Sequence, residues 1–176
     1  MTSEDNMNAP IFKKLLLLSV AVAVITGLGF QCSSPNIQAG KLYFQQYQSS
    51  QDTAKLNDAI RMFRKEITEN PNSGEGWYWL GISEGMKRNF TELRKSWMKA
   101  QQLGPGQKED ITKNTPYMWL QAINQGSVQY QKARTIPIQS KKDAYLKEAE
   151  EAYITANFLW PDTSAKYNGY AYLANV

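Results

Sequence analysis

The chain has 176 residues, 42% of them hydrophobic and 12% aromatic, and 20 basic against 16 acidic side chains give a net charge of +4. This composition supports a packed core, and the small net charge gives no reason to expect a nucleic-acid partner. Histidine is absent and Cys32 is the single cysteine, which excludes an intramolecular disulfide and any histidine-based catalysis or metal site. No spaced set of carboxylates or lysines stands out, so we expect no enzyme, metal site or cofactor.

The N-terminal segment, residues 1–31, has the pattern of an export signal or a membrane anchor. A polar start ends in Lys13 and Lys14, and an uncharged apolar run follows from Leu15 to Phe30. As a helix this run would span about 24 Å, short of the roughly 30 Å hydrocarbon core of a bilayer. A basic flank before a short apolar run is typical of a secretory signal, and it predicts that the rest of the chain lies on the non-cytoplasmic side.

The residues that follow the apolar run resemble the end of a bacterial lipoprotein signal, although Phe30 and Gln31 stand where that family has small residues. The resemblance implies that Cys32 is the site of lipid (palmitate) attachment and that the protein is tethered to the cell membrane or the outer membrane. Residues 32–39 would then form a tether. Two alternatives stay open: an uncleaved membrane anchor, or an ordinary cleaved signal that leaves Cys32 as a free thiol.

A period of 34 residues runs through the rest of the chain and separates Pro71 from Pro105. Each proline ends an apolar-periodic segment. Between the two prolines lie, in order, Trp77, Leu80, Gly81, Trp97 and Ala100. This pattern resembles the tetratricopeptide repeat, a pair of helices that stack with small residues at their contacts. The resemblance implies an all-α, right-handed α-solenoid of helix hairpins over residues 40–176.

Three repeats and a partial fourth are expected, at about 40–73, 74–107, 114–163 and 164–176. In the third repeat, Thr115-Pro116 is expected to begin a long first helix, with Tyr117 and Leu120 among its core residues. The matching core residues of the second helices are Ala59 and Phe63 in the first repeat, and Ala149, Tyr153 and Ala156 in the third. The partial repeat 164–176 indicates either a capping helix or a chain that continues in a longer protein.

In the tetratricopeptide family the first helix of each repeat lines a concave groove that holds partner segments. Carried over to this sequence, the groove residues are Phe44, Tyr78, Ile82, Met86 and Met118. Truncating a groove residue is expected to weaken binding and leave folding almost unchanged. The alternative is that these side chains pack on the next helix. The five tryptophans, in contrast, are expected in the core.

Six basic residues are expected to share the edge of the stack at which each first helix turns into the second. These residues are Lys87, Arg88, Lys132, Arg134, Lys141 and Lys142. Such an edge is either a solvated face or a surface for anionic lipid headgroups or an acidic partner.

The sequence therefore predicts a membrane-tethered scaffold that binds segments of other cell-envelope proteins and no nucleic acid. The alternative function is a carbohydrate- or peptidoglycan-binding module, which would need exposed aromatic rings. The solvent exposure of Trp79, Trp119 and Trp160 distinguishes the two.

Overall fold

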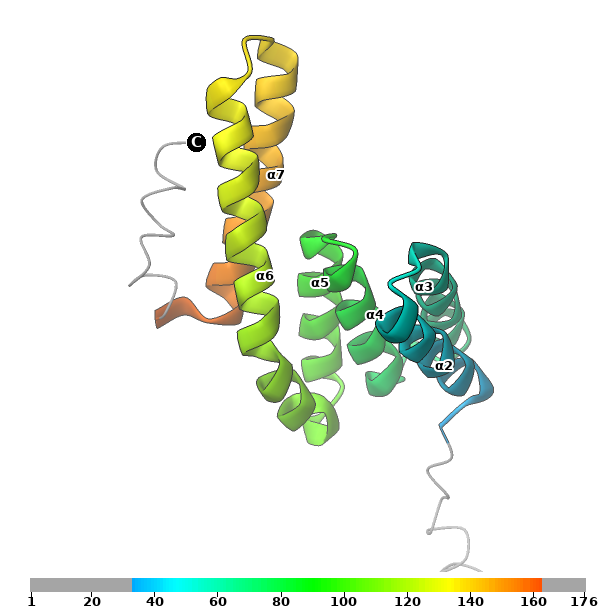
Figure 1. Ribbon diagram of the computed structural model, residues 1–176. Coiled ribbons are helices and arrows are strands. Elements are labelled where there is room, and N and C mark those ends of the chain that lie inside the picture. Colours follow the sequence, from blue (N-terminus) through cyan, green and yellow to red (C-terminus); the bar gives the residue numbers. More distant parts are fainter. Residues whose placement is uncertain (1–32, 163–176) are drawn as a thin grey trace, which may run out of the picture. The chain divides into compact units, whose positions relative to one another are not determined.

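The computed structural model describes residues 33–162, and these residues are helical throughout, with no strand (Figure 1). The elements are α2 (Pro35–Ser50), α3 (Thr53–Glu69), α4 (Gly74–Met86), α5 (Phe90–Gln102), a 3-10 turn η1 (Pro105–Gln107), α6 (Lys108–Thr135) and α7 (Gln139–Leu159). The all-α prediction is confirmed for this part of the chain. The predicted signal or anchor (1–31), Cys32 and the partial repeat 164–176 lie outside the described residues. None of the described helices is long and apolar enough to cross a membrane.

The six α-helices form three consecutive hairpins, α2–α3, α4–α5 and α6–α7 (Figure 1). The two junctions between hairpins differ. At the first, α3 packs against α4; at the second, α5 packs chiefly against α7. In addition α4 touches both α2 and α6, so the first helices of the three hairpins are neighbours.

Side-chain caps fix where the first three helices begin. The Ser34 hydroxyl accepts the Ile37 N–H at 3.2 Å, and Asp52 and Ser73 accept the Ala54 and Gly76 N–H groups at 2.8 and 3.1 Å. The tether predicted for residues 32–39 is therefore wrong from residue 35 onward. Proline suits the first turn of a helix, and burial of Ile37 (1% exposed) holds this turn against the core.

Helix α6 starts seven residues before the predicted start at Thr115 and carries Pro116 in its interior. A proline there removes one backbone hydrogen bond, so it normally ends a helix. Three contacts stabilise the turns before it: Ile111 is buried, Lys113 pairs with Glu109 at 2.8 Å, and the Thr115 hydroxyl donates to the Ile111 carbonyl at 2.8 Å. The prediction was wrong because these contacts compensate for the proline.

In each hairpin a glycine of the first helix lies directly against an aromatic ring of the second. The pairs are Gly40 with Phe63, Gly81 with Trp97, and Gly126 with Tyr153. A Cβ atom on these glycines would lie 2.4, 2.3 and 2.6 Å from the nearest ring carbon, closer than side chains pack. The three contacts thus require glycine and set the distance between the two helices.

The positions of these glycines correct the predicted register of the outer repeats. Gly40, expected at a repeat boundary, lies inside α2, and Gly126 takes the contact position in α6. Tyr117 and Leu120, expected in the core, are 46% and 47% exposed. Gly40 lies five residues after the start of α2, Gly81 seven after the start of α4 and Gly126 eighteen after the start of α6, so the contact glycine has no fixed distance from the helix start.

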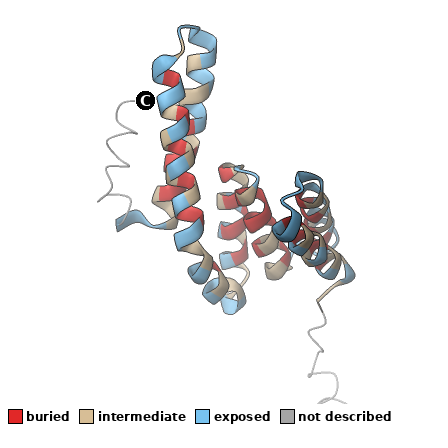
Figure 2. Ribbon diagram, in the orientation of Figure 1, coloured by how far each residue is buried: buried red, intermediate tan, exposed pale blue. Residues whose placement is uncertain are grey.

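The α6–α7 hairpin extends beyond the other two and ends in an exposed tip (Figures 1 and 2). Between Tyr130 and Glu148 the one buried residue is Ala133. Burial is concentrated instead where the hairpins face one another (Figure 2), with Ala149, Tyr153 and Ala156 buried as predicted. The tip therefore adds little to the common core.

Candidate functional site

A groove of about 690 Å³ lies along the first helices of the three hairpins. Its lining comes from α2, α4 and α6 and from the turn after α2: Lys41, Phe44, Gln45, Gln48, Gln51, Tyr78, Trp79, Ile82, Met86, Asn114, Tyr117 and Met118. The five residues named from the sequence are all among them. The volume lies in the range of roughly 300–1,000 Å³ that is usual for ligand-binding pockets.

The five named residues form the floor of this groove and belong largely to the core. Phe44, Tyr78, Ile82 and Met118 are buried, and Met86 is half-buried. A Cβ on Gly85 of α4 would lie 2.9 Å from the Met118 sulfur, so α6 packs closely on α4 here. The expectation that truncating Tyr78 leaves folding unchanged is therefore wrong, because removal of a buried aromatic side chain leaves a cavity.

The rim of the groove is what a partner can reach, and it is mostly amide in character. Gln45, Gln48, Gln51 and Tyr117 are exposed, and Asn114 is half-buried. Each amide side chain offers both donors and acceptors. Tyr117 was expected in the core, whereas the resemblance to the repeat family also implied groove positions at Lys41 and Gln48.

An aromatic cluster supports the floor. The Trp79 ring meets Phe44 and Tyr78 edge-on, with centroids 5.6 and 5.3 Å apart. The Lys41 ammonium lies 5.3 Å from the centre of the Trp79 ring and forms an ion pair with Glu75. The aromatic contacts hold the floor in place. Because the Lys41 charge is paired with Glu75, uncharged amide groups dominate the rim.

Burial, together with the nearby Asp110 carboxylate, raises the pKa of Tyr78 from 10.0 to about 12. The Tyr78 hydroxyl also accepts a hydrogen bond from the Asn114 amide at 2.9 Å. The phenol is therefore neutral at physiological pH and joins α4 to α6 as a fixed polar group of the groove.

The shifted pKa predicts a loss of stability in alkali that depends on Tyr78. The folded state favours the neutral phenol, so its contribution is complete below pH 10 and is lost as the pH rises towards about 12. The difference corresponds to roughly 2–3 kcal/mol. Tyr78→Phe should be less stable by about 0.5–1.5 kcal/mol at pH 7, through the lost hydrogen bond, and more stable than wild type near pH 12. Urea unfolding of both proteins across this range tests it; parallel curves would contradict it.

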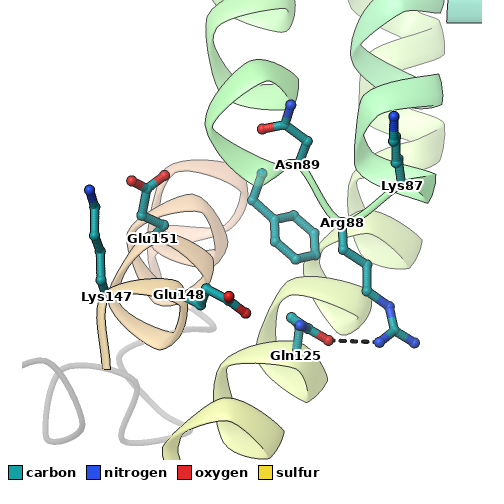
Figure 3. A pocket seen from close by; sticks show the side chains of 8 residues that line it. Lys87, Arg88, Asn89, Gln125, Lys147, Glu148 and Glu151 are labelled. Carbon is teal, nitrogen blue, oxygen red and sulfur yellow. Dashed lines mark hydrogen bonds between the residues drawn. The ribbon is translucent and has the colours of Figure 1, made fainter. Parts of the chain in front are cut away.

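The six basic residues do not form one continuous edge, because the α6–α7 hairpin carries four of them away from the others. Lys87 and Arg88 line a separate cavity of about 430 Å³, which Glu148 and Glu151 of α7 also line (Figure 3). The other four lie in the last turn of α6 and the first turn of α7, where the Lys132 ammonium is 5.5 Å from the centre of the Tyr145 ring.

The tryptophans mostly pack inside. Trp97 and Trp119 are buried, Trp77 and Trp79 are half-buried, and Trp160 is 41% exposed and meets Trp119 edge-on at 5.9 Å. The described residues thus present no row of open rings, although Trp160 and Tyr117 are accessible singly.

No group of three histidine, cysteine or acidic residues within residues 33–162 is arranged to hold a metal ion. Comparisons of the chain with models of protein families, with curated proteins and with solved structures gave no match. The groove and its chemistry are therefore the features of the protein that indicate its function.

Proposed function

We propose that this protein is an interaction scaffold, a right-handed α-solenoid of the tetratricopeptide type, that binds extended segments of cell-envelope proteins in its groove. The observation that carries the proposal is that the groove draws its lining from the first helix of three successive hairpins, α2, α4 and α6. A surface of this kind suits a segment that runs across the stack rather than a compact small molecule.

The chemistry of the groove supports an extended peptide. Exposed amide side chains such as Gln45 and Gln48 can pair with the N–H and C=O groups that an extended segment leaves free. Tyr117 and the half-buried Met86 offer apolar contact at the same rim. Since Lys41 is paired with Glu75, we expect a partner segment of low charge.

Binding is tested with the exposed rim rather than the buried floor. We expect Gln48→Ala with Tyr117→Ala to lose at least tenfold in recovery of copurifying envelope proteins from detergent extracts, with a thermal midpoint close to wild type. Met98→Ala is the matched control, because Met98 is 44% exposed on α5, outside the groove. Unchanged recovery in the double variant, or an equal loss in the control, would remove the groove from consideration.

The membrane tether is the second part of the proposal. Its support is the basic flank and the apolar run that precede Cys32. Wild type should carry a lipid mass and partition into detergent, and Cys32→Ser should lack that mass and move to the aqueous phase. Equal membrane retention of both forms without lipid would favour an uncleaved anchor.

A carbohydrate- or peptidoglycan-binding module is the competing function, and the amide-rich rim beside Tyr117 is the observation in its favour. Of the three tryptophans that distinguish the two functions, the buried Trp119 and the half-buried Trp79 weigh against it, and Trp160, 41% exposed, weighs for it. Sedimentation with isolated peptidoglycan separates the two: the scaffold should stay in solution, and the wall-binding module should pellet with loss of binding in Tyr117→Ala.

A further inference from the structure

The cavity of about 430 Å³ beneath the α6–α7 hairpin is separate from the groove (Figure 3). The turn between α4 and α5 forms one wall with Lys87, Arg88 and Asn89, and α7 forms the other with Lys147, Glu148 and Glu151. Phe90 at the start of α5 and Gln125 of α6 complete the lining. The cavity thus lies where the α4–α5 hairpin meets the α6–α7 hairpin.

The lining of this cavity carries both basic and acidic side chains, and they form no ion pair with one another. Within residues 33–162, none of the ion pairs involves a charged residue of the lining. Glu148 accepts a hydrogen bond from Gln129, and the carboxylate of Glu151 stays available. The lining therefore offers charges of both signs to a ligand.

The backbone at Arg88 adopts an energetically unfavourable conformation. Its φ of 66° is left-handed, a conformation that glycine adopts freely at helix ends and that other residues avoid. The guanidinium is fixed by a 2.9 Å hydrogen bond to Gln125. Asn89 is fixed as well, through its amide and its backbone N–H, which bond Glu84 at 3.0 and 2.9 Å. An arginine at a position that favours glycine therefore presents its charge to the cavity.

We propose that this cavity binds a small zwitterion with one phosphate or carboxylate group and one primary ammonium group. The anionic group lies against Arg88, where the guanidinium edge not used by Gln125 can bond two oxygens, and Lys87 adds a second positive charge to the same wall. The ammonium group lies against Glu151 and Glu148, and the linking carbons cover Phe90. Such a group occurs both in free phosphoethanolamine-like metabolites and in lipid headgroups.

The test uses the full chain in a non-ionic detergent and three probes: O-phosphoethanolamine, methyl phosphate and ethylamine. We expect calorimetric titration to show O-phosphoethanolamine binding at least tenfold more tightly than either single-charge probe. Arg88→Gly should weaken it at least tenfold while the thermal midpoint stays the same or rises, because glycine removes the backbone strain. Glu151→Gln should weaken the binding of O-phosphoethanolamine and leave the binding of methyl phosphate unchanged.

Gln51→Gly is the matched control, since Gln51 has a similar φ of 57° outside this cavity. Because Gln51 belongs to the rim of the groove and not to this cavity, Gln51→Gly should leave the affinity for O-phosphoethanolamine unchanged. Equal affinity for methyl phosphate and O-phosphoethanolamine, or full affinity in Arg88→Gly, would overturn the proposal. Vesicles then distinguish a lipid headgroup from a free metabolite. If headgroups occupy the cavity, adding phosphatidylethanolamine to phosphatidylcholine vesicles should lower the apparent affinity for O-phosphoethanolamine by competition. If a free metabolite occupies it, that affinity should stay unchanged. Either result is consistent with a zwitterion site.

Discussion

Replacing Gly81 with leucine should lower the free energy of unfolding by roughly 1–3 kcal/mol through overpacking. A Cβ on Gly81 would lie 2.3 Å from Cδ1 and 2.7 Å from Nε1 of Trp97, and 3.3 Å from the Ser96 Cβ. The Trp97 ring is fully buried and cannot move aside without opening the α4–α5 contact. Thermal or urea unfolding measures the loss.

Gly106→Leu is the control for this substitution, because a Cβ at Gly106 would meet no atom within 4 Å. Its effect should stay within about 0.5 kcal/mol. If both variants melted together with wild type, α4 and α5 would not pack as described, and the contact glycines of the outer hairpins would lose their role as well.

Removal of the opposing ring should cost still more. Trp97→Ala is expected to destabilise the fold by about 3–5 kcal/mol, since it empties a fully buried site between the helices. It also removes the ring that stacks on Tyr78 at 6.3 Å and the hydrogen bond from its Nε1 to the Tyr78 carbonyl at 3.2 Å. The urea midpoint of the variant against wild type is the measurement. A loss under 1 kcal/mol would show that the ring contributes little to the core.

Combining Gly81→Leu with Trp97→Ala separates the contact from general damage to the core. Leucine would grow into the space that the ring leaves, so the double variant should be less destabilised than the sum of the two single ones, by 0.5–3 kcal/mol. Simple additivity would mean that residues 81 and 97 do not share that space.

The middle hairpin could be predicted from the sequence because proline ends it on both sides. Both of its helices, α4 and α5, lie inside the predicted repeat 74–107. The resemblance also identified the floor of the groove, since Tyr78, Ile82 and Met86 share one helix face at a spacing of four. The local sequence pattern was sufficient to predict the hairpin whose repeat has the usual length.

The outer hairpins could not be predicted in the same way, because their lengths are set by packing. Nothing in the local sequence marks Gly126 as the residue that packs against Tyr153. Pro116 predicts a helix start, and only the burial of Ile111 in the folded protein shows why the helix begins earlier. Gln51 and Asn114 were not predicted in the groove for a related reason: they reach it only through the turn after α2 and the early start of α6.

The projecting tip of the α6–α7 hairpin gives experimental access to the molecule. With Ala133 as its one buried residue between Tyr130 and Glu148, the tip can unravel at a small free-energy cost while the hairpin bases stay packed. Its backbone amides should therefore exchange with deuterium well before those of α4. A fluorophore or affinity tag inserted at Pro137 would sit at the end of this arm, away from the groove, and could report on partner capture without entering it.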